Sequence, residues 1–218
     1  MRRRAHKLIR RMSTVAVAAA LLALPVASAA DIAGTAHDFS ATGWTSNNQI
    51  CVACHTPHNG DTTIPGSPLW NHEITATAAF GVYASSTLNA GPMGQPDGLS
   101  KLCLSCHDGS VALDNFGGVT TGSTFISGNA LLGTDLSNDH PISFTYDPAL
   151  ATADGELWDP TIATVAQLGG GTIDATMLFG GQMECASCHD VHNGPGTTGA
   201  LLRISNVGSA LCTTCHTK

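Results

Sequence analysis

The longest apolar run in this chain lies close to its amino terminus, between Val15 and Val26, and it follows a strongly basic stretch. A helix that spans a bilayer needs about 20 apolar residues, so this run is too short to do so. Small residues at 27–30 follow it, as at a signal-peptide cleavage site. Residues 1–30 are therefore predicted to be a signal peptide of an exported protein, with the mature chain beginning at Ala30 or Asp31. An uncleaved membrane anchor is the alternative.

Beyond residue 30 the hydrophobic periodicity is weak. Aromatic residues make up only 5% of the chain, and glycine occurs 24 times. We expect one loop-rich domain over 31–218, with short helices at four cysteine motifs and minor strands around Val119–Ile126. The segment Asp147–Gly171 is punctuated by proline and glycine and is predicted to be a surface excursion. Such a composition gives a modest side-chain core, so covalent or metal support is expected.

The charge is unevenly distributed along the chain. Six of the nine basic residues lie within 1–30, whereas all sixteen acidic residues lie beyond it, so the remainder carries three basic and sixteen acidic residues, a formal charge of −13. A surface of this kind disfavours nucleic acid and anionic membranes, and no stable membrane insertion is expected. It suits cationic partners, metal ions or a mineral surface. Simple solubility explains it equally well.

The eight cysteines form four copies of Cys-x-x-Cys-His, which is the attachment signature of c-type haem. Two thiols three residues apart lie on one side of a helical turn and can bond the two vinyl groups, and the histidine reaches the iron. We therefore predict four covalently attached haem c groups, which would supply much of the protein interior. The predicted attachment residues are Cys51, Cys54, Cys103, Cys106, Cys185, Cys188, Cys212 and Cys215, and the predicted proximal iron ligands are His55, His107, His189 and His216.

Other uses of the cysteines explain the pattern less well. Zinc sites also use paired cysteines, but they do not require a histidine after every second one. A thioredoxin-like Cys-x-x-Cys occurs once, in a reducing compartment. Disulfides in an exported chain would leave the four histidines without a role.

The motifs also reveal an internal duplication. Those at Cys51 and Cys185 continue to a second histidine and Asn-Gly, as C-V-A-C-H-T-P-H-N-G and C-A-S-C-H-D-V-H-N-G. The other two are preceded by S-K-L and S-A-L and lack that histidine. The order is thus two copies of a two-haem unit, over about 37–110 and 140–218.

Five histidines remain as candidates for the distal iron ligands. A histidine three residues after a proximal ligand lies on the same face of the haem, so His58 and His192 are better placed to reach a neighbouring iron. His37 precedes the first pair of motifs, and His140 precedes the second pair. The matched set of distal candidates is His37, His58, His140 and His192. His72, beside Trp70, is the weakest candidate, and His37 the next weakest because it lies near the mature terminus.

From about His37 onward, the stretches CHTPHN, LCLSCHDG, NDHP, CHDVHN and LCTTCH resemble the doubled-CxxCH family of multihaem cytochromes c. They are similar in particular to tetrahaem outer-surface cytochromes of metal-reducing bacteria, some of which polymerise into filaments. The resemblance implies closely packed bis-histidine haems, with one distal histidine donated between subunits in a homopolymer. It also implies a location at the cell surface rather than in the periplasm, and either redox proteins or extracellular metal and mineral acceptors as partners.

An electron carrier is the predicted function, because two axial nitrogens leave no position on iron for a substrate. A periplasmic multihaem reductase, or its electron-donor subunit, is the alternative, and it would need an open iron. All four motifs end in histidine and spare histidines exceed irons, which favours the carrier over the enzyme. A purely structural role for haem does not account for four covalent redox centres.

Overall fold

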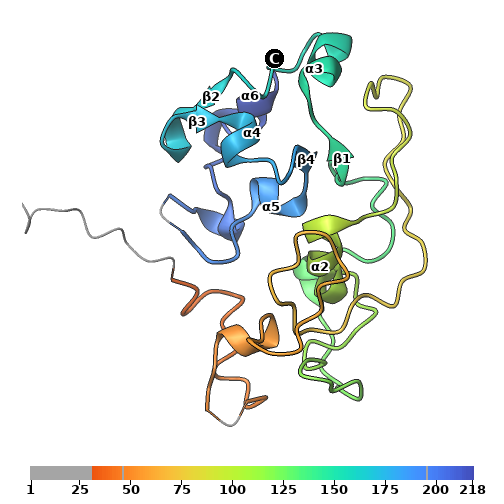
Figure 1. Cartoon of the computed structure of the whole chain (residues 1–218), viewed down its shortest axis with the longest axis vertical. Helices are drawn as coiled ribbons and strands as arrows, with labels where there is room; N and C mark the ends of the chain where they lie inside the picture. Colours follow the sequence, from red (N-terminus) through yellow and green to blue (C-terminus); the bar gives the residue numbers. More distant parts are fainter. Residues whose placement is uncertain (1–30, 46, 195) are drawn as a thin grey trace, which may run out of the picture.

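The structure is a computed structural model that describes residues 31–45, 47–194 and 196–218. The predicted signal peptide therefore lies outside the described residues. Regular elements are short, and most of the chain is loop (Figure 1). The α-helices are α2 (Gly98–His107), α3 (Pro148–Asp154), α4 (Ile173–Thr176), α5 (Cys185–Cys188) and α6 (Cys212–Cys215), and the 3-10 turns are η1 (Cys51–Ala53), η2 (Gly128–Ala130), η3 (Ala166–Leu168), η4 (Gly199–Leu201) and η5 (Val207–Ser209).

Two small antiparallel sheets of two strands each complete the secondary structure. Strands β1 (Phe144–Thr145) and β4 (Gln182–Met183) pair Phe144 with Met183. Strands β2 (Thr164–Val165) and β3 (Gly171–Thr172) pair Val165 with Gly171. Strand β4 runs almost directly into α5, so the first sheet positions the third cysteine motif. The prediction of a loop-rich fold with short helices at the motifs is confirmed.

The main side-chain core lies in the second half of the chain. It contains Tyr146, Val165, Ile173 and Met177, each at most 2% exposed. A smaller cluster of Phe80, Leu104 and Leu136 lies beside α2. Figure 1 shows the second half in cyan and blue above the orange and green first half. The yellow segment that precedes α2 runs along one side of both.

Two sequence expectations about local structure are wrong. The region Val119–Ile126 forms no strand, and it is extended loop with Val119 and Phe125 exposed. Residues Asp147–Gly171 are not a surface excursion, because they contain α3 and β2 and contribute Val165 to the main core. The proline and glycine there begin and end elements that are packed inward.

The residues at the two ends of α3 explain why Asp147–Gly171 was wrongly predicted to be a surface loop. The Asp147 side chain accepts a hydrogen bond from the Leu150 amide at 2.8 Å, and Pro148 follows at the first turn, so α3 begins there. Gly155 ends α3 with φ 75°. Each residue has the role of a helix terminus, although the same residue types also occur in loops.

In the part of the chain that the structure describes, no helix has the length and apolar character needed to cross a bilayer.

Candidate functional site

The first, third and fourth cysteine motifs each fold as a single helical turn that ends at the histidine, and the second forms the last turn of α2. The amide of His55 donates to the carbonyl of Cys51 at 2.8 Å, and that of His216 donates to Cys212 at 2.9 Å. His189 makes the same bond to Cys185 at 3.0 Å. Because residues three and four apart share one face of a turn, both thiols and the histidine of a motif can address one planar ligand.

Three motif histidines are oriented by backbone carbonyls. The Nδ1 atoms of His55, His107 and His189 lie 2.7, 2.8 and 2.9 Å from the oxygens of Pro68, Ala130 and Ala200. A metal-bound histidine usually donates its other ring N–H in this way, which fixes the tautomer. The Nε2 atom of each ring is thereby left with a lone pair for a metal.

The first motif is held by the chain that follows it. The Asn71 amide donates to Cys54 O at 2.9 Å, and the Thr56 amide donates to Leu69 O at 3.0 Å. Gly60 permits this approach, since a Cβ there would lie 2.7 Å from the carbonyl carbon of Leu69. The segment around Leu69 is thus seated on the turn that ends at His55.

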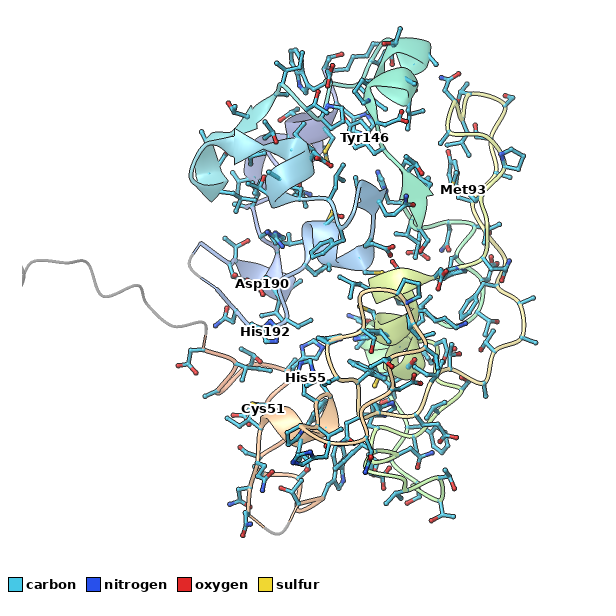
Figure 2. All side chains as sticks on the ribbon, in the orientation of Figure 1. Cys51, His55, Met93, Tyr146, Asp190 and His192 are labelled. Carbon is cyan, nitrogen blue, oxygen red and sulfur yellow. The ribbon has the colours of Figure 1, made fainter. Side chains whose placement is uncertain are left out.

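Three motif histidines each face a histidine from elsewhere in the chain. The ring centres of His55 and His192 are 6.1 Å apart and nearly parallel, at 21°. Figure 2 shows these two side chains next to one another, although they come from different halves of the chain. The other two pairs are His107 with His37 at 6.0 Å and His216 with His140 at 6.4 Å.

This spacing fits two imidazoles on opposite sides of one iron. An imidazole nitrogen lies about 2 Å from a bound metal, which puts the two ring centres roughly 6–6.5 Å apart. Among the described residues, no three His, Cys, Asp or Glu side chains converge as a ligand set. Axial pairs without further protein ligands are what a metal in a macrocycle needs, because the macrocycle supplies the remaining nitrogens.

Two predicted ligands are in none of these pairs: the distal candidate His58 and the proximal candidate His189. His58 is exposed, and His189 is oriented by Ala200 O. Within the described residues neither ring is stacked on another histidine, so the structure does not bring these two together with a partner.

His72 differs from the other candidates. It is buried, with 4% of its surface exposed. Its Nδ1 lies 2.8 Å from Glu73 O, and its Nε2 lies 3.1 Å from Ala112 O. The same Nε2 also lies 3.5 Å from Cys106 Sγ, so His72 is held by backbone carbonyls directly beside a predicted haem-attachment cysteine.

Burial lowers the pKa of two of the paired histidines. For His37 desolvation is the largest cause, followed by His107, His189 and His192. For His216 desolvation is again the largest cause, followed by His140. A lowered pKa keeps the imidazole neutral, which is the form that binds a metal.

None of the eight cysteines is in a disulfide. Burial is the main reason that the pKa of Cys54 is raised to about 11 and that of Cys106 to about 12, and Cys54 contributes to the latter. The thiols of Cys103 and Cys185 are hydrogen-bonded to each other, which is the largest cause of the raised pKa of Cys103. Burial is also the main reason that the pKa of Cys188 and that of Cys215 are raised, and Cys212 contributes to both. The second motif thus lies near the first and the third, and the third lies near the fourth.

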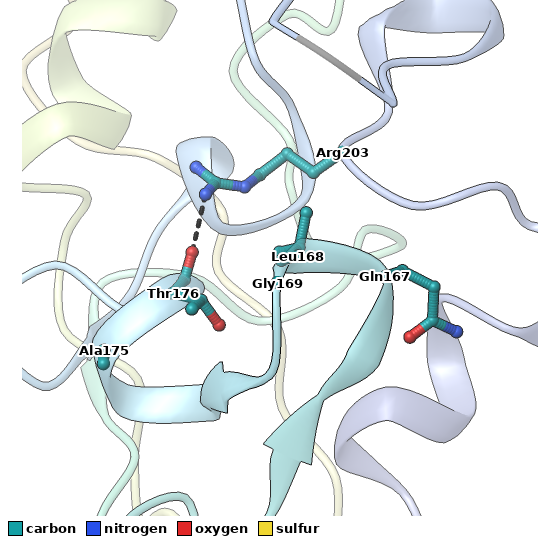
Figure 3. A pocket seen from close by; sticks show the side chains of 6 residues that line it. All are labelled: Gln167, Leu168, Gly169, Ala175, Thr176 and Arg203. Atoms are coloured by element: carbon teal, nitrogen blue, oxygen red, sulfur yellow. Dashed lines mark hydrogen bonds between the residues drawn. The ribbon is translucent and has the colours of Figure 1, made fainter. Parts of the chain in front are cut away.

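A surface hollow of about 490 Å³ beside α4 involves no cysteine motif. Figure 3 shows Arg203 at its edge, where the guanidinium donates to Thr176 O at 2.6 Å. The hollow is shallow, and it does not contain the histidine pairs.

One family model matches the carboxyl-terminal part of the chain. Residues 179–218 match the family model described as the doubled CXXCH motif, and this match contains the third and fourth motifs. No curated protein matches the chain significantly. The matched motifs imply covalently bound haem c, and they indicate a multihaem c-type cytochrome that functions in electron transfer.

One buried residue beside the motifs has no counterpart in the sequence predictions. Glu184 directly precedes Cys185 and is 4% exposed. A signal for it does exist, because an acidic residue at the N-cap, with Ser187 at the third helical position, forms a reciprocal capping box on α5.

Proposed function

We propose that this protein is a tetrahaem electron carrier in which every iron is bound by two histidines. The observation that supports this most strongly is the set of three histidine pairs with ring centres 6.0–6.4 Å apart. Each pair joins a motif histidine to a non-motif histidine. We assign His192, His37 and His140 as the distal ligands opposite His55, His107 and His216.

His58 is the remaining member of the matched set, and His189 is the remaining proximal ligand. We assign His58 to the iron of His189, either within one chain or between two copies. Its exposure favours donation to a neighbouring copy, as the filament hypothesis requires. In a polymer of this kind, the fourth haem site is completed by the next subunit.

When bound, haem supplies reversible one-electron exchange at iron. The part of the protein in that function is to hold each imidazole pair in place. The carbonyls of Pro68, Ala130 and Ala200 fix three of the rings, so little rearrangement accompanies a change of oxidation state. Neighbouring motifs in the order one to four favour transfer along a row.

We also propose export and function at the cell surface, with redox proteins or extracellular metal and mineral acceptors as partners. The basic and apolar residues of 1–30 support export, and the formal charge of −13 on the remainder supports cationic or metal acceptors.

A reductase is the second candidate, and a specific observation favours it. His189 has no histidine partner within the described chain, which would leave one iron open to a substrate.

Spectroscopy of the purified protein tests both candidates. The carrier is expected to contain four haems per chain, all low-spin in the ferric state and unreactive toward cyanide and carbon monoxide. A single high-spin haem that persists in wild-type protein would favour the reductase.

Assembly is tested with His58→Ala and the matched variant His72→Asn. Negative-stain microscopy should show filaments for wild type and His72→Asn, whereas His58→Ala should give single particles with one high-spin haem. Monodisperse wild-type particles with four low-spin haems would contradict the filament and place His58 within its own chain.

A further inference from the structure

The two halves of the chain meet where α2 contacts α5. These helices carry the second and third motifs, and Cys103 and Cys185 lie close together there. In the proposed carrier these residues attach two different haems. An electron that passes from the first two-haem unit to the second would therefore cross at this contact.

Glu184 lies at the centre of the same junction. Its Oε2 accepts from the Ser100 amide at 3.0 Å and from the Ser143 hydroxyl at 3.2 Å, and the Ser100 hydroxyl also donates to it. The Ser100 hydroxyl in turn accepts from the Cys185 amide at 3.0 Å. One carboxylate thus connects α2, α5 and the segment before β1.

The packing around this carboxylate is tight. Ser100 and Ser187 are 0% exposed, and a Cβ at Gly98 would lie 2.7 Å from Glu184 Oε1. Gly98 also has φ 51°, which disfavours a side chain. In the first unit the residue that precedes the equivalent motif is Ile50, so the carboxylate is a feature of the junction and not of the repeat.

Neutral donors surround the carboxylate. The described ion pairs are Lys218 with Glu156 and His192 with Asp190, so Glu184 is in neither. Burial raises its pKa, while the hydrogen bonds from Ser100 and Ser143 act in the opposite direction. The charge of Asp97 also raises the pKa, and the hydrogen bonds offset part of the shift because they stabilise the ionised form.

We propose that Glu184 is a positioning residue for electron transfer between the two units, which holds the second and third haem attachments together and lowers the reduction potentials of both haems. This inference rests on the proposed function. A buried negative charge favours the ferric over the ferrous state, and burial reduces its screening by solvent. When an electron passes between these two haems, one iron is oxidised and the other is reduced. Because the carboxylate lies near both haem attachments, it stabilises the ferric state of each.

The test compares Glu184→Gln with wild type in potentiometric titrations of the complete four-haem protein, with haems assigned by NMR. Glutamine keeps the size and one acceptor but removes the charge. Two potentials, those of the haems at Cys103/Cys106 and Cys185/Cys188, should shift upward while the other two remain unchanged. The control Asp174→Asn removes an exposed carboxylate on α4 and should shift none of them.

A second variant guards against misfolding of the first. Ser143→Ala removes one donor from the carboxylate at a less buried position, so the same two potentials should shift downward. Unchanged potentials in both variants, with four low-spin haems retained, would overturn the role of Glu184 and leave the carrier intact. A high-spin haem in wild type would instead overturn the proposed function itself.

Discussion

In the proposed carrier, single histidines decide which irons are closed to further ligands. The cysteine spacing alone predicts the attachment residues and the proximal histidines, because both follow from one helical turn. The pairing of distal histidines is not readable from sequence, since His37 reaches His107 and His192 reaches His55 only through the course of long loops. Glu184 was missed because its role depends on Ser100, which is far away in the sequence.

Replacing one distal candidate should open one iron. In His192→Ala the iron of His55 loses its sixth ligand, so one of four haems should become high-spin and bind carbon monoxide, as measured by electron paramagnetic resonance and absorption difference spectra. His72→Asn is the control, and it should keep four low-spin haems. Its cost should be in stability, about 1–3 kcal/mol, because a buried hydrogen-bonded side chain is altered. An unchanged spectrum for His192→Ala would disprove the pairing.

Alanine variants of two glycines distinguish the energetic cost of backbone strain from that of steric overlap. Gly98 and Gly91 both have positive φ, but only Gly98 has an atom of Glu184 within reach of an added Cβ. Each alanine variant should lose about 1–2 kcal/mol through strain, and Gly98→Ala should lose more. Chemical denaturation of both variants measures the difference, and equal losses would show that the Glu184 contact accommodates the methyl group.

At the scale of elements, sequence patterns predicted the helices that local residue spacing defines, but they did not predict the structure of segments whose conformation depends on tertiary packing. The motif helices were predicted because cysteine and histidine spacing defines them. The segment Asp147–Gly171 was misread because Pro148 and Gly155 mark helix ends as well as loops, and only tertiary contacts reveal that Val165 is 1% exposed. The strand expected at Val119–Ile126 does not form, because side chains rather than a partner strand accept from its amides: Asn115 from Gly122, and Asp114 from Ser123 and Thr124.

The small core in the second half should be sensitive to truncation. Ile173 is 1% exposed in α4, so Ile173→Ala should lower the free energy of unfolding by about 2–5 kcal/mol. Ile162 is 70% exposed, and Ile162→Ala should stay within about 0.5 kcal/mol of wild type. Denaturant titrations followed by far-ultraviolet circular dichroism give both values. Comparable losses would mean that this cluster contributes little beyond what the attached groups supply.

At the scale of the whole molecule, charge governs encounters with acceptors. Residues 31–218 carry three basic and sixteen acidic residues, and one of the three cations, Lys218, is paired with Glu156. The field outside the protein is therefore strongly negative and decays over about 8 Å at physiological ionic strength.

Electron transfer to small acceptors should show this field directly. Rates with a cationic acceptor should fall as salt is raised, whereas rates with an anionic acceptor of similar potential should increase. Stopped-flow oxidation of the reduced protein at several ionic strengths measures both trends. A salt-independent rate with both acceptors would indicate that electrons leave through a locally neutral surface.

The carbonyls that orient His55, His107 and His189 also bear on the order in which the protein matures. Each lies downstream of its histidine, by 13, 23 and 11 residues. In the export that we propose, which starts at the amino terminus, every one of these motifs would emerge before the segment that orients its ring. Covalent attachment can therefore take place on a flexible chain, and the imidazole is locked in its tautomer afterwards. Maturation would then proceed motif by motif along the chain. At each motif the haem would be attached first, and the segment that follows would then orient the histidine.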